Sequence, residues 1–104
     1  MLSKPTGNTG LYALTTTTGT CNVVTLLTGD RYGIPNQTLQ AVKVRIAVSQ
    51  PAVIAFGTDV ANNNSDILMP ANTIEHFALK ATNTVSYVLL TGASAGYISI
   101  TPVA

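Results

Sequence analysis

The chain has 104 residues, of which 46% are hydrophobic and only 9% are charged, and its formal net charge is +1. Globular proteins carry about 25% charged residues, so this composition excludes a disordered tail, a charged coiled coil and an electrostatic nucleic-acid binder. Threonine (16) and asparagine (8) supply much of the polar character. Such a neutral surface suits a protein that stays assembled with others.

The length suffices for one domain with a single core that needs no metal or disulfide. We therefore expect residues 1–104 to form one domain. Residues 1–10 are polar and contain glycine, and we expect them to extend as an N-terminal arm. They lack the apolar segment of a signal peptide, so we expect synthesis in the cytosol.

The predicted elements are short β-strands separated by turn residues. Residues 11–17 and 20–27 predict two strands joined as a hairpin near Thr18-Gly19, and residues 28–36 predict a turn and loop. Further strands are expected over 42–48, 52–57, 67–70, 74–80, 84–90 and 97–101. A polar loop over 58–66 and turns at 81–83 and 92–96 separate the later strands.

Residues 42–48 show the clearest alternation in the chain. The even positions are valine or isoleucine, and the odd positions include Lys43 and Arg45. This pattern predicts a half-buried strand with a basic outer stripe. That stripe is interpreted as a solvated strand face or as a set of partners for acidic groups on a neighbouring chain.

The predicted core combines this strand with the apolar positions of the later strands. It comprises Val42, Val44, Ile46, Val48, Ile54, Phe56, Val88, Leu90, Ile98 and Ile100. In the strand over 84–90 the opposite positions, Val85, Tyr87 and Leu89, are apolar too and form an alternative inward set. About eight short strands with regular turn signals predict an all-β protein, a single small antiparallel β-sandwich that is jelly-roll-like.

The candidates for chemistry are few. Cys21 is the only cysteine, so it predicts a small buried thiol and no internal disulfide. His76 is the only histidine. Alternation places Ile74, His76 and Ala78 on one face and Glu75 and Phe77 on the other, so we expect a surface or interface histidine rather than a catalytic base.

No cofactor or metal is expected. Asp59 and Asp66 flank an asparagine-rich loop and offer oxygen ligands for calcium, but their spacing matches no EF-hand. Such loops usually cap their own turns. A histidine metal site lacks a second histidine or a cysteine pair. No catalytic, cofactor-binding or metal-binding residue is therefore assigned.

From Val42 to Thr101 the order of segments is distinctive. A valine-rich strand precedes Gln50–Thr58, a polar loop, Ser65–Asn72 and Glu75–Phe77, and strands over Val85–Leu90 and Gly96–Thr101 follow. This order resembles small β-sandwich virion structural proteins of tailed bacteriophages. The resemblance implies a capsid cement or decoration role and carries no catalytic residues.

We therefore expect a non-enzymatic virion protein on the capsid surface, assembled in the host cytoplasm. Its expected partners are the major capsid protein, other virion proteins and copies of itself, with no nucleic acid and no membrane. The alternative is a receptor- or glycan-binding module of a tail or fibre. A small hydrolase is a third reading, which rests on His76 alone.

Overall fold

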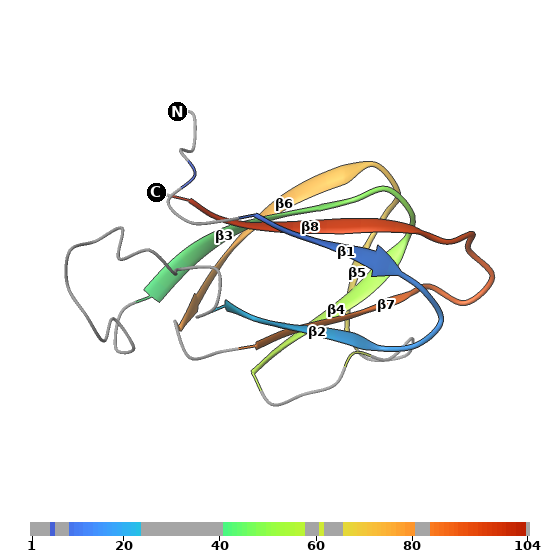
Figure 1. The fold of residues 1–104 in the computed structure, drawn as a ribbon, viewed down its shortest axis with the longest axis horizontal. Helices are drawn as coiled ribbons and strands as arrows, with labels where there is room; N and C mark the ends of the chain where they lie inside the picture. Colours follow the sequence, from blue (N-terminus) through green and yellow to red (C-terminus); the bar gives the residue numbers. More distant parts are fainter. Residues whose placement is uncertain are drawn as a thin grey trace.

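The structure is a computed structural model that describes residues 5, 9–23, 41–57, 61, 66–80 and 84–103. They form eight strands in two sheets of four, which face each other as layers of a sandwich (Figure 1). The sheet orders are β1-β8-β3-β6 and β2-β7-β4-β5. The strands are β1 (Gly10–Leu14), β2 (Gly19–Asn22), β3 (Ala41–Val48), β4 (Ala52–Gly57), β5 (Ile67–Met69), β6 (Thr73–Lys80), β7 (Thr84–Leu89) and β8 (Gly96–Val103).

The strand pairing is nested along the chain. β1 pairs with β8, β2 with β7, β3 with β6 and β4 with β5, all antiparallel. Antiparallel pairings of β3 with β8 and of β4 with β7 complete the two sheets. The chain is thus one long hairpin, bent between β4 and β5 and rolled into two layers, which is the jelly-roll arrangement. The predicted antiparallel β-sandwich of jelly-roll type is confirmed.

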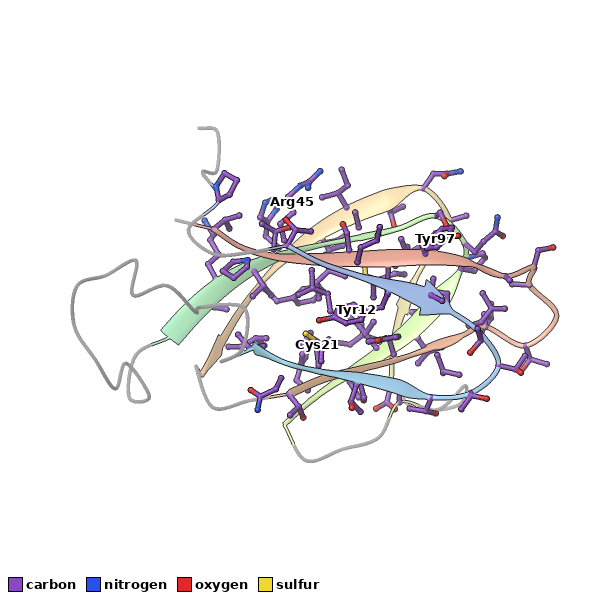
Figure 2. The ribbon with its side chains drawn as sticks, viewed as in Figure 1. Tyr12, Cys21, Arg45 and Tyr97 are labelled. Atoms are coloured by element: carbon purple, nitrogen blue, oxygen red, sulfur yellow. The ribbon has the colours of Figure 1, made fainter. Side chains whose placement is uncertain are left out.

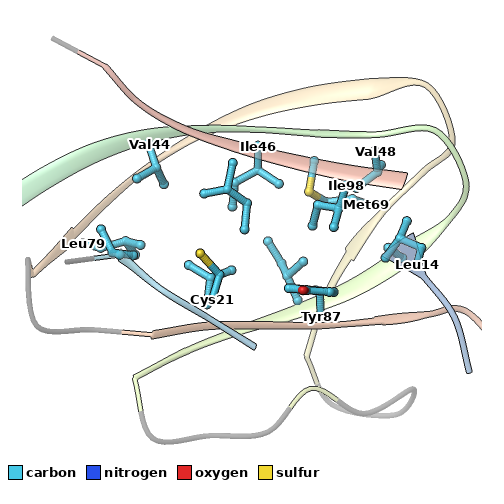
Figure 3. Packing of buried hydrophobic residues seen from close by; sticks show 14 of the residues in the cluster. Leu14, Cys21, Val44, Ile46, Val48, Met69, Leu79, Tyr87 and Ile98 are labelled. Atoms are coloured by element: carbon cyan, nitrogen blue, oxygen red, sulfur yellow. The ribbon is translucent and has the colours of Figure 1, made fainter. Parts of the chain in front are cut away.

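The main core lies between the two sheets (Figure 3). In β3, Val44 and Ile46 are fully buried while Lys43 is exposed on the opposite side, as the alternation predicts. Phe56 packs against this core while partly exposed. Four more predicted core residues are buried here: Val48, Ile54, Ile98 and Ile100. Val42 belongs to β3, but its side chain lies outside the described residues.

The predicted inward set on β7 is wrong, and the alternative set is correct. Val85, Tyr87 and Leu89 face the main core. Val88 and Leu90 instead pack on the opposite side of the sheet, in a second cluster with Val53, Ala55 and Ala61. Because β7 is apolar on both sides, its sequence alone could not distinguish the two orientations.

A buried hydroxyl lies within this second cluster. Ser86 is fully buried on β7, and its Oγ accepts a hydrogen bond of 2.9 Å from the Ala61 backbone N–H. The same Oγ lies 3.5 Å from the Ala55 carbonyl oxygen, to which it donates. Ser86 therefore fixes Ala61 against the sheet.

The predicted N-terminal hairpin is wrong. β1 and β2 belong to different sheets, so the connection over 15–18 crosses from one layer to the other. It passes beside the end of β7, where the Leu89 N–H donates to the Thr15 carbonyl oxygen at 3.0 Å. Both strands pair with partners in the C-terminal part of the chain rather than with each other.

Parts of the expected organisation lie outside the described residues: 24–40, including the turn over 28–36, and 81–83. Of the expected arm over 1–10, Pro5 forms an isolated bridge with Val103 and Gly10 begins β1.

Candidate functional site

One row of side chains crosses the whole β1-β8-β3-β6 sheet. In register, Leu11 lies opposite Ser99, Ser99 opposite Ala47, and Ala47 opposite Ile74. Directly opposed residues share one face of a sheet, and Ala47 and Ser99 each lie between two core residues of their strand. The row therefore lies on the side of the sheet that points away from the other layer, which we call the outer face.

This row lines an open groove with a volume of about 380 Å³. Three large apolar side chains border the groove and are exposed to solvent: Leu11 at 67%, Ile74 at 50% and Tyr97 at 61%. The remaining lining is Ala47, Val48, Ser49, Asn72, Thr73 and Ser99. Large apolar side chains gathered on one exposed face are typical of an interaction site.

Backbone contacts fix the position of Tyr97. The Ser49 N–H donates to the Tyr97 carbonyl oxygen at 3.0 Å, and the Tyr97 N–H donates to Ser49 Oγ at 2.8 Å. The preceding Gly96 allows this approach, because a Cβ there would collide with Ser49 Oγ and with Gln50. Tyr97 is thus held by its main chain while its ring stays exposed (Figure 2).

The groove continues into a basic stripe, Lys43 and Arg45 on β3. Residues two apart on a strand share a face and lie about 7 Å apart, so Arg45 is one such step from Ala47 and Lys43 is two. Arg45 is half-buried and Lys43 exposed, and Figure 2 shows Arg45 on the outer side of the sheet. His76 lies opposite Arg45 in register.

Among the described residues, no carboxylate lies on the outer face. Glu75 is opposite the buried Ile46 in register, so it points to the inner side, at the exposed margin of β6. Asp66 immediately precedes β5 in the other sheet. Asp30 and Asp59 lie outside the described residues. The described outer face therefore combines an apolar groove with positive charge.

Between the sheets, Tyr12, Cys21 and Tyr87 form a polar-aromatic cluster (Figures 2 and 3). The Tyr12 hydroxyl and the Cys21 thiol hydrogen-bond with an O···S distance of 2.9 Å, and the two tyrosine ring centroids are 5.5 Å apart. Burial raises the pKa of the Cys21 thiol, although the Tyr12 hydrogen bond acts in the opposite direction. Cys21 is 3% exposed, so the predicted buried thiol is confirmed.

The other sequence candidates do not gather around this cluster. His76 is exposed on the outer face, as predicted. The calcium hypothesis needs Asp59, which lies outside the described residues, whereas Asp66 is half-buried. No group of three histidine, cysteine, aspartate or glutamate side chains within the described ranges could hold a metal ion. The described part of the chain also has no helix long and apolar enough to span a membrane.

Comparisons with protein-family models, with curated proteins and with solved structures give no match to this chain. Its function is therefore inferred from the fold and the outer face.

The sequence did not reveal the groove. Leu11, Ile74 and Tyr97 belong to β1, β6 and β8, and only the long-range strand pairing brings them onto one surface. One signal was present in the sequence, because alternation places the apolar Ile74 on the same face as the polar His76.

Proposed function

We propose that this protein is a non-enzymatic structural component of a tailed-phage virion. It binds the outside of the head as a cement or decoration protein and stabilises the contacts between major capsid subunits. The observation that carries the proposal is the groove, an exposed apolar surface across all strands of one sheet. The order of segments from Val42 to Thr101, which resembles small virion proteins, supplies the setting.

The jelly-roll fold is compatible with this role. Jelly rolls occur in viral capsid domains, in lectin domains and in cupins. One fold hosts many functions, so the role has to be argued from the surface.

The size of the outer face favours binding at many equivalent positions. Strands spaced about 4.8 Å apart and rising about 3.3 Å per residue give this sheet a face of roughly 500 Å² in projection. A standard interface buries about 800 Å² on each partner, so one outer face alone is at the weak end. An oligomer that contacts several shell subunits at once gains affinity through effective concentration.

The edge strands of the two sheets differ in composition. β1 and β6 are the edges of one sheet, and β2 and β5 are those of the other. β5 carries two exposed apolar residues, Ile67 at 43% and Leu68 at 55%. Glu75, an inward-pointing charge on edge strand β6, is a feature that discourages uncontrolled edge-to-edge pairing.

The test uses particles assembled with and without the protein. Mass spectrometry of purified virions should detect the polypeptide at a copy number that follows the major shell protein. Particles that lack it should assemble but break at lower temperature, at low salt or under internal genome pressure. Equal robustness of both particles contradicts the proposal.

A receptor- or glycan-binding module of a tail or fibre is the second candidate. It is favoured by the exposed Tyr97 ring, because an aromatic ring beside the polar Ser49 and Asn72 is a suitable surface for a sugar. Particles that lack the protein would then be as robust as wild type but fail to adsorb to cells.

A further inference from the structure

We infer that the outer face binds an extended, acidic segment of the shell protein, with an apolar side chain in the groove and carboxylates beside Arg45 and Lys43. This inference rests on the proposed function and names the surface and the chemistry of its partner.

The apolar part of the segment follows from the groove. Leu11, Ile74 and Tyr97 are each half or more exposed, and together they border a volume of about 380 Å³. That volume is enough for one or two apolar side chains. A partner side chain that covers the groove removes this apolar surface from water, which favours binding.

The acidic part follows from the charge of the outer face. Lys43 and Arg45 lie on it, and the described residues place no carboxylate there to neutralise them. A strand-like segment packed along β3 repeats the two-residue spacing of about 7 Å. An apolar residue in the groove therefore predicts carboxylates two and four positions further along the segment.

The outer face of a second copy of the protein does not supply the acidic groups that would match Lys43 and Arg45. Two outer faces packed together would bring cations against cations or against the groove, because the described part of the face carries no acidic residue. Nucleic acid is also a poor fit, since two cations and one exposed tyrosine are less than an electrostatic groove needs.

The first experiment measures binding of the whole protein to heads assembled without it, by co-sedimentation. L11S/I74S removes two of the three large apolar side chains that border the groove, and L68S on β5 is its control because Leu68 is also exposed. K43Q/R45Q removes two positive charges, and T16E/T17E in the exposed connection between β1 and β2 changes the net charge equally. Each variant is first checked for an unchanged melting temperature.

We expect L11S/I74S to raise the dissociation constant by about tenfold or more. K43Q/R45Q should raise it by about tenfold at about 50 mM NaCl and by less at about 200 mM, because salt screens the charge pairs. L68S and T16E/T17E should stay within about twofold of wild type. The inference of an acidic partner is overturned if K43Q/R45Q has no effect. It is also overturned if T16E/T17E weakens binding as much as K43Q/R45Q does.

A second experiment identifies the partner directly. A benzophenone amino acid in place of Tyr97 is photo-crosslinked to the heads, and the product is sequenced by mass spectrometry. The expected product is a shell-protein peptide with aspartate or glutamate within about four residues of the crosslink. A crosslink to this same protein, or to nucleic acid, overturns the inference.

These experiments distinguish failure of the proposed function from failure of the inference about the outer face. Wild-type protein that does not bind the heads overturns the proposed function and the inference together. Binding that survives both outer-face substitutions overturns the inference alone and leaves the cement role intact.

Discussion

At the residue scale, Cys21 and Tyr12 connect the two layers of the sandwich through one thiol–phenol hydrogen bond. Burial is the largest cause that raises the pKa of Cys21, Tyr12 and Tyr87 above their ordinary values of 9.0, 10.0 and 10.0. All three groups are neutral when protonated, so the folded state holds its protons more tightly than the unfolded state does. Their contribution to stability is complete well below pH 9, the ordinary pKa of a thiol, and is lost as pH rises through and above that value.

The first prediction is an alkaline loss of stability. The urea midpoint should be constant from pH 7 to about pH 8.5 and should then fall, because the unfolded chain releases protons that the folded chain retains. Y12F and C21A should each reduce the slope of this fall. A thiol reagent should label Cys21 only in urea, and rapid labelling of the native protein would contradict the buried thiol.

The second prediction concerns Ser86, which is fully buried. S86A leaves the Ala61 backbone N–H without this acceptor. The substitution should therefore lower the free energy of unfolding by about 1–3 kcal/mol. S99A, on the half-buried outer face, serves as the control and should change it by less than about 0.5 kcal/mol. An equal effect of both substitutions would show that Ser86 does not hold Ala61 in place.

At the scale of the elements, glycine and tyrosine are matched across paired strands. Gly19 on β2 pairs with Tyr87 on β7, and a Cβ at Gly19 would overlap the Tyr87 ring. Gly10 makes similar room for the ring of Tyr12 on the same strand. The two rings that meet in the core thus depend on two glycines in edge strands.

The third prediction tests this match with a double-mutant cycle. G19A should destabilise the protein by about 1–3 kcal/mol, because the added methyl group overpacks the site. In a Y87L background the same substitution should cost much less, since the ring that it meets is gone. Urea unfolding of the four proteins measures the coupling, and additive effects would mean that the ring moves away at no cost.

The strands differ in how clearly their sequences show which face points to the core. β3 was predicted with its correct faces, because Val44 and Ile46 alternate with Lys43 and Arg45 and only one side is apolar. β7 was not, because the cluster around Ala61 makes its other side apolar as well.

The strand pairing could not be predicted from the local sequence, for a different reason. β1 and β2 read as a hairpin, yet their partners are strands some 60 to 90 residues away in the chain. The groove shares this limit, since Leu11, Ile74 and Tyr97 become neighbours only through the same long-range register. The positive charge beside it was predicted from the local pattern.

At the scale of the whole molecule, substitutions in the groove should affect the stability of the phage head without affecting the stability of the free protein. Leu11 and Ile74 are exposed, so L11S/I74S should leave the free energy of unfolding within about 0.5 kcal/mol of wild type. Heads reconstituted with this variant should nevertheless lose heat resistance. Calorimetry of the free protein and of the heads gives both readings, and a destabilised free variant would mean that the groove belongs to the core.

The nested strand pairing also determines when the protein can fold during synthesis. Gly10 pairs with Ile100, so β1 has no partner in its sheet until β8 has been translated. At about 5–20 residues per second, the ribosome takes roughly 5–18 seconds to cover that stretch. β3 also lacks one of its two neighbours until then. The nascent chain therefore carries unpaired β-strands through most of its translation, and unpaired strands of this kind are prone to aggregate.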